Sequence, residues 1–184
     1  MLNRIYIFGA SGSGATSLGK AVCERIGFAH FDADDYLWLP TDEPYSETRT
    51  PEEYIEILGG DLRGSEKWIL SGHISFGLMD EFTGLYELVV FLRVPPEIRM
   101  ERLRRRERER YGNEILPGGR RHEASIKFLD YAAEYDEGTL RRSLREHLKW
   151  LESLKCPVLK IENDSFRRSA EAIVEAIGNQ SAVN

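Results

Sequence analysis

The sequence is poor in cysteine and has no long apolar run. Its two cysteines, Cys23 and Cys156, lie far apart and form no CxxC pair, so both are expected to be buried thiols in a reducing compartment. No apolar run approaches the roughly 20 residues that span a bilayer. Acidic residues follow the first apolar stretch too soon for a signal peptide. We therefore expect a cytoplasmic protein with no membrane partner.

The sequence also lacks an excess of basic charge and any histidine pair at metal-ligand spacing. The 184 residues carry a net charge of −6, which argues against general nucleic-acid binding. Basic residues nevertheless concentrate between positions 93 and 121, where a local anion site remains possible. A chain of this length fits one domain with a core of its own.

Short apolar runs alternate with helical patterns along the whole chain. We predict strands at residues 4–8, 28–31, 68–70, 88–92 and 158–161, with amphipathic helices between them. Such alternation predicts an α/β fold with a mainly parallel five-stranded sheet covered by helices on both faces. Polar clusters follow the first three strands, at the sheet edge where ligands bind in this architecture.

Several helix boundaries are marked by cap residues. Thr50-Pro51-Glu52-Glu53 combines an N-cap, a proline at the first helical position and a capping-box glutamate. Pro95-Pro96 opens an arginine-rich helix that should end near Gly112. Gly27 is placed to end the first helix. Leucines spaced along residues 140–154 predict a further amphipathic helix.

A glycine-rich loop joins the first predicted strand to the first helix. Its backbone N–H groups and the helix dipole would bind a phosphate, and the predicted ligand-binding residues are Gly9, Ser11, Gly12, Ser13, Gly14, Ala15, Thr16 and Ser17. The loop matches the phosphate-binding pattern G-x-x-x-x-G-K-[ST] except that Ala15 replaces the lysine. Thr16 stands where a hydroxyl would hold Mg²⁺. The alternative is a glycine-rich turn without a ligand.

The missing lysine raises the question of which cation replaces it. Lys20 lies roughly 7.5 Å further along the helix axis, on a different face. Arg102 and Arg106 are four residues apart on one helix, so they share a face and could contact phosphate oxygens together. For most arginines of this helix, interleaved with glutamates, a solvated face is the expected environment.

The order of these motifs resembles a known family. GASGSGATSLGKAV, HFDADDYLW, WILSG and VVFLRVPPEIRMERLRRRE are similar to segments of the P-loop nucleoside monophosphate kinases, in particular an adenylate kinase-related bacterial branch with a small residue in place of the lysine. The resemblance covers nearly the whole chain. It implies a three-layer P-loop fold in one domain, residues 1–184, with a substrate-binding helical insert at about 33–66 and an arginine-rich helical lid at about 99–142.

The resemblance also implies ATP and Mg²⁺ as cofactors and assigns site residues. Related kinases use Asp-x-Asp after the second strand, which places Asp32 in the metal shell with Thr16 and gives Asp34 the acceptor or general-base role. Arg142 resembles the second lid arginine, so Arg102, Arg106 and Arg142 together could supply the missing charge. A solvated acidic loop or a helix N-cap is the alternative for the aspartates. The carboxylate that many relatives carry after the third strand is absent here.

Three functions fit these features. The first is a kinase that transfers the γ-phosphate of ATP to a nucleoside monophosphate, as adenylate kinase does. The second is a non-catalytic nucleotide-binding or regulatory protein, which the missing lysine suggests. The third is a kinase of a small hydroxylated metabolite, which Asp-x-Asp suits equally well. The expected partners are a nucleotide and a small acceptor, and the expected state is a monomer or a weak dimer.

Overall fold

The computed structural model describes residues 1–75, 77–138 and 142–179, which group into two compact units. The first unit comprises residues 1–9, 14–92 and 154–184, and the second comprises residues 10–13 and 93–153. The boundary therefore passes through the glycine loop. Among the described residues, no helix is both long enough and apolar enough to cross a membrane.

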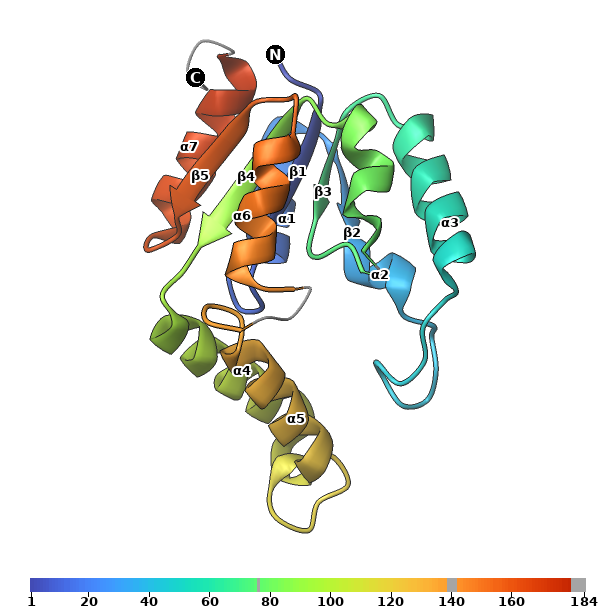
Figure 1. Cartoon of the computed structure of the whole chain (residues 1–184), viewed down its shortest axis with the longest axis vertical. Helices are drawn as coiled ribbons and strands as arrows, with labels where there is room; N and C mark the ends of the chain where they lie inside the picture. Colours follow the sequence, from blue (N-terminus) through green and yellow to red (C-terminus); the bar gives the residue numbers. More distant parts are fainter. Residues whose placement is uncertain (76, 139–141, 180–184) are drawn as a thin grey trace. The chain divides into compact units, whose positions relative to one another are not determined.

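A five-stranded sheet forms the centre of the first unit (Figure 1). The strand order is β2-β3-β1-β4-β5, and β1 pairs in parallel with both β3 and β4. The strands are β1 (Arg4–Gly9), β2 (Ala29–Asp32), β3 (Trp68–Ser71), β4 (Leu88–Arg93) and β5 (Val158–Glu162). The predicted α/β class and its parallel sheet are confirmed.

Alternating side chains along β1 point to opposite faces of the sheet. Ile5 and Ile7 join a fully apolar cluster with α1 (Ala15–Ile26) and α7 (Phe166–Gly178). Tyr6 and Phe8 point the other way, where Tyr6 stacks on Tyr86 at a centroid distance of 5.0 Å. Also in this unit, Tyr54 of α3 (Pro51–Gly64) contacts Phe82 of the 3-10 helix η1 (Leu78–Leu85). The sheet is thus covered on both faces.

The second unit is helical. It contains α4 (Pro96–Tyr111), the 3-10 turn η2 (Gly112–Ile115), α5 (His122–Ala133) and α6 (Leu144–Ser153). Helices α4 and α5 lie side by side (Figure 1) and enclose a small apolar cluster built on Met100, Leu103 and Ala132. The helix predicted over residues 140–154 begins at Leu144 in the described chain, and residue 140 lies outside the described residues.

The cap signals place most helix ends correctly. Thr50 forms the predicted capping box with Glu53, and Gly27 ends α1 in the left-handed conformation. The short helix α2 (Ala33–Leu37) and η1 were not predicted. One cysteine also departs from expectation, because Cys156 is only partly buried while Cys23 is buried as predicted.

Candidate phosphate-binding site

The polar residues that follow the strands of the first unit gather at one edge of the sheet. Ser71 pairs with Ile7 of β1 on one side and with Asp32 of β2 on the other, so β2 and β3 end level and β1 runs two residues further, to Gly9. Because parallel strands present their carboxyl ends together, this edge is where an α/β sheet binds ligands. This register places the strands as predicted, and the meeting of the three polar clusters that follow them stays a prediction.

Thr16 and Asp32, the two predicted metal-binding residues, interact. The Thr16 hydroxyl lowers the pKa of the Asp32 carboxyl as a side-chain hydrogen-bond partner, although the residues lie on α1 and at the end of β2. The Asp34 backbone N–H donates a second bond to Asp32 at 3.1 Å, so Asp32 also caps α2. The Asp32 side chain can therefore cap α2 and still contribute an oxygen to a metal.

The Asp32 carboxylate is partly buried and lies against a glycine. A Cβ on Gly72, which has φ +97°, would lie 3.1 Å from Asp32 Oδ1, so a larger residue there would crowd the carboxylate. Burial raises the pKa of the Asp32 carboxyl, in opposition to the two hydrogen bonds it accepts. A cation beside this carboxylate would offset its desolvation.

Asp34 and Asp35 lie in the first turn of α2 and are exposed. Close to them, the Tyr36 hydroxyl donates to Asp61 of α3 at 2.6 Å. Asp34 thus lies on the same short element that Asp32 caps, two residues beyond the carboxylate with which Thr16 interacts. Its predicted acceptor or general-base role remains a prediction.

Ser71, the last residue of β3, follows the predicted strand 68–70 and is not a carboxylate, as the sequence already indicated. Its hydroxyl lies 2.9 Å from His30 Nε2, and Gly19 of α1 is packed against both side chains. Burial lowers the pKa of His30, which favours the neutral imidazole. Among the described residues, no three His, Cys, Asp or Glu side chains form a metal cluster. A metal at Asp32 would therefore need oxygen ligands from the phosphate and water, as Mg²⁺ commonly has.

The glycine loop is divided between the two units. In the first unit, Gly14 begins α1 in the left-handed conformation, and Ala15 packs into the apolar cluster of that unit with only 7% of its surface exposed. In the second unit, Ser13 N–H donates to the Ala10 carbonyl at 3.0 Å. Gly12, with φ +81°, lies so close to α4 that an added Cβ would be 2.8 Å from the Arg99 carbonyl oxygen.

The three predicted arginines have different surroundings within the second unit. Arg102 Nη1 donates to the Gly12 carbonyl at 3.3 Å, so this guanidinium lies at the glycine loop. Arg106 instead lies over the Phe128 ring at 5.5 Å. The charge of Arg142 acts on the pKa of Tyr135 and on that of His147. The contact of Arg102 supports its predicted contribution at the loop, and those of Arg106 and Arg142 stay predictions.

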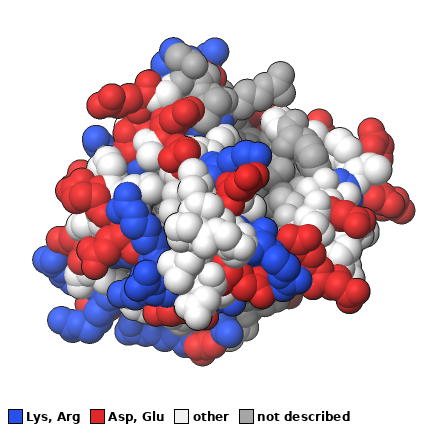
Figure 2. Space-filling view, turned by 90° about the horizontal axis from the view of Figure 1, so that it is seen from below, with Lys and Arg blue, Asp and Glu red and all other residues white. Residues whose placement is uncertain are grey.

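The remaining arginines of α4 largely follow the expectation of a solvated face. Arg105 and Glu109 form an exposed i,i+4 pair at 3.7 Å, an arrangement that contributes little to stability. Figure 2 shows Lys and Arg side chains interspersed with Asp and Glu over the face it displays. Arg99 is the exception, because its side chain is fully buried.

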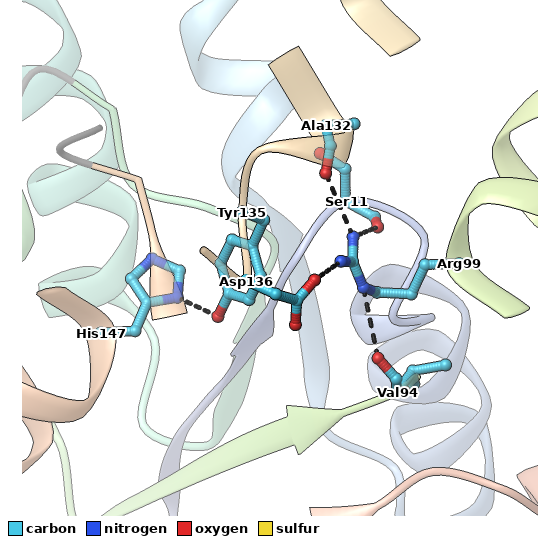
Figure 3. A network of polar contacts seen from close by, with 7 residues as sticks. All are labelled: Ser11, Val94, Arg99, Ala132, Tyr135, Asp136 and His147. Atoms are coloured by element: carbon cyan, nitrogen blue, oxygen red, sulfur yellow. Dashed lines mark hydrogen bonds and ion pairs between the residues drawn. The ribbon is translucent and has the colours of Figure 1, made fainter. Parts of the chain in front are cut away.

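Arg99 is the functional candidate that the sequence reasoning missed. Its guanidinium donates to the Ser11 carbonyl of the glycine loop at 3.3 Å and to the Val94 carbonyl at 3.2 Å, and it pairs with Asp136 (Figure 3). The available signal was its spacing. Arg99 lies four residues before the core residue Leu103 and eight before the buried Glu107, which places it on the inward side of α4.

The fold and the glycine loop together define a P-loop α/β protein. A family model described as "AAA domain" matches residues 5–127, and the chain belongs to that family. The chain is 45% identical over 167 residues to "Uncharacterized protein YqaC" of Bacillus subtilis (strain 168), a match that covers 89% of this chain and 90% of that protein.

The solved structures that share the fold include small-molecule kinases. Shikimate kinase from Acinetobacter baumannii, solved with shikimate, gives a TM-score of 0.55 at 20% identity and covers 96% of this chain and 93% of that chain. A gluconokinase from Sinorhizobium meliloti gives 0.52 at 16% identity, with 97% of each chain covered. At these identities the likeness shows the fold.

Proposed function

We propose that the protein is an ATP-dependent kinase of a small molecule. The observation that carries the proposal is the interaction between Thr16, at the start of α1, and the Asp32 carboxylate. A hydroxyl and a partly buried carboxylate are oxygen donors that suit Mg²⁺. The fold and the glycine loop fit ATP as the phosphate donor, and kinases with this fold point to the same class of reaction.

Each proposed residue has a definite task. The backbone N–H groups of the loop would bind phosphate oxygens, and Arg102 would add positive charge beside Gly12. Thr16 and Asp32 would hold Mg²⁺, which when bound would neutralise charge on the transferred phosphoryl group. Asp34 would accept the proton of the acceptor hydroxyl. Segments 33–66 and 99–142 would serve as the acceptor-binding insert and the lid.

The charge of segment 33–66 favours a hydroxylated metabolite as the acceptor over a nucleoside monophosphate. This segment has ten acidic residues and two arginines, a net charge of −8. One arginine, Arg49, donates from the same Nη1 to the carbonyls of Tyr36 at 2.9 Å and Trp38 at 3.1 Å, where it holds the end of α2. The other, Arg63, packs against Gly59 of its own helix. A dianionic phosphate would find little complementary charge there.

A nucleoside monophosphate remains the second candidate acceptor. The sequence resemblance to adenylate kinase-related proteins supports it, and so do the lid arginines Arg102, Arg106 and Arg142, which could bind an acceptor phosphate. A non-catalytic nucleotide-binding protein is the third possibility, because position 15 has no lysine.

Transfer of labelled γ-phosphate from MgATP tests the proposal across two acceptor panels: nucleoside monophosphates, and uncharged or amine-bearing polyols. We expect transfer to a polyol and a loss of on the order of 10²-fold in Thr16→Ala, which removes a group that stabilises transition-state charge. Thr83→Ala is the matched control, because it removes a hydroxyl that donates a local hydrogen bond, to the Asp80 carbonyl three residues earlier. ATP binding without transfer to any acceptor would favour the non-catalytic protein, and absence of both would overturn the proposal.

A further inference from the structure

Arg99 has no role in the predicted phosphate site, yet it is fully buried and contacts the loop. We propose that Arg99 is a positioning residue that fixes the first half of the glycine loop, residues 10–13, in the conformation that presents the Gly12 N–H to phosphate. The inference rests on the proposed function only in that the fixed loop binds the phosphate of a nucleotide. The positioning itself is a property of the unliganded chain.

The surroundings of Arg99 hold its guanidinium in one place (Figure 3). Nε donates to Val94 and Nη2 pairs with Asp136, while Nη1 donates to the carbonyls of Ser11 at 3.3 Å and Ala132 at 3.5 Å. The Tyr135 ring lies below the guanidinium carbon at 5.1 Å. A buried charge that loses its partners is costly. The planar fork therefore has one favourable orientation, and the Ser11 carbonyl is bound by a rigid donor.

The direction of the Ser11 carbonyl decides the direction of an amide. In a trans peptide the C=O of one residue and the N–H of the next point in opposite directions. When Arg99 holds the Ser11 carbonyl, it turns the Gly12 N–H away from α4. Arg102 contacts the Gly12 carbonyl, and the N–H of the same peptide unit, that of Ser13, donates to the Ala10 carbonyl, so this unit is held from both sides.

The backbone of Gly12 also packs closely against α4. Its Cβ position is filled by the Arg99 carbonyl oxygen at 2.8 Å and by the Leu103 side chain at 3.2 Å. The first turn of α4 thus contacts the loop through both the main chain and the side chain of Arg99. This packing explains why residues 10–13 group with the helical unit and not with the sheet.

The experiment compares Arg99→Met with Arg105→Met, which removes an arginine of the same helix whose side chain is 68% exposed. Amide exchange of Ser13 and the amide chemical shift of Gly12, both measured by NMR without nucleotide, report the loop conformation. Calorimetry measures the affinity of the loop for MgADP. In Arg99→Met we expect faster exchange of the Ser13 N–H, which donates to the Ala10 carbonyl in the held loop, a changed shift at Gly12, and an affinity loss of about tenfold or more, since displacements near 1 Å are costly at such sites. Arg105→Met should change none of these.

Three further variants separate positioning from general stability. Arg99→Lys keeps the charge but cannot reach Ser11, Val94 and Asp136 at once, so it should not restore the loop amides. Asp136→Asn should show a smaller effect in the same direction. If Arg99→Met fails to fold because Asp136 loses its partner, the double variant Arg99→Met/Asp136→Asn removes both charges together. A merely structural role would lower the free energy of unfolding and leave exchange and affinity of the folded protein unchanged, which would overturn the inference.

The two proposals can fail separately. If the wild-type chain binds no MgADP but Arg99→Met still loosens the loop amides, the kinase proposal fails and the positioning role stands. If the wild-type chain binds MgADP and folded Arg99→Met binds it equally well with unchanged exchange, the positioning role fails and the kinase proposal stands.

Discussion

At the scale of single residues, local chemistry decides protonation. His147 is buried in α6, and its Nδ1 lies 2.8 Å from the Tyr135 hydroxyl. Burial, with a smaller contribution from the Arg142 charge, lowers the pKa of His147 to about 3. His147 is therefore neutral in the folded protein. Its protonation would add a positive charge beside Tyr135, whose ring also contacts the Arg99 guanidinium.

The pH dependence of stability follows from this shift. An unfolded histidine has a pKa near 6.5, so between about pH 6.5 and 3 the unfolded chain binds a proton that the folded chain does not. Stability from this group is therefore present above pH 6.5 and lost as the pH falls. We expect His147 to account for a loss of about 2 kcal/mol between pH 7 and pH 5.

Urea unfolding of the wild type and His147→Gln at the two pH values measures that loss. The variant should show a smaller loss than the wild type by about this amount. Equal losses in the two proteins would contradict the assignment.

At the scale of elements, cap residues set the helix boundaries. Thr50 Oγ1 accepts from Glu53 N–H at 3.2 Å, and Glu53 Oε2 accepts from Thr50 N–H at 2.9 Å. Thr50→Ala removes half of this capping box and should destabilise the protein by about 1 kcal/mol. Chemical denaturation measures the change. Thr50→Ser retains the hydroxyl and should lie close to the wild type, and a loss as large as in Thr50→Ala would show that the methyl group matters more than the cap.

Elements with clear boundary signals were predictable, and elements without them were not. Pro96 and Gly112 mark α4 at both ends, as the sequence indicated. Helix α2 has only five residues, too few for a 3.6-residue period to be visible, and its N-cap Asp32 was assigned to the metal shell. Arg99 was missed for a related reason. An arginine on an apolar stripe is normally solvated, and its partner Asp136 lies 37 residues away in sequence.

At the scale of the whole molecule, the missing lysine can be tested by restoring it. The Ala15 side chain lies in the apolar cluster of the first unit. We therefore expect Ala15→Lys to give no gain in MgATP affinity or in phosphate transfer, because the new side chain must leave a packed environment. Ala15→Met, of similar length and uncharged, controls for the added volume. A large gain in the lysine variant alone would indicate a decayed kinase site instead of one that relies on arginine.

The sequence by itself determined the parallel α/β fold, the strand-loop-helix context of the glycine loop and the ends of α3 and α4. These features depend on periodicity, caps and turn residues, which act over a few neighbouring positions. Only the tertiary structure decided that Thr16 meets Asp32, that Arg102 lies at Gly12 and that Arg99 holds Ser11. Each of those contacts joins residues 16 to 90 positions apart. No local pattern encodes such pairs, because strand order and helix packing bring them together.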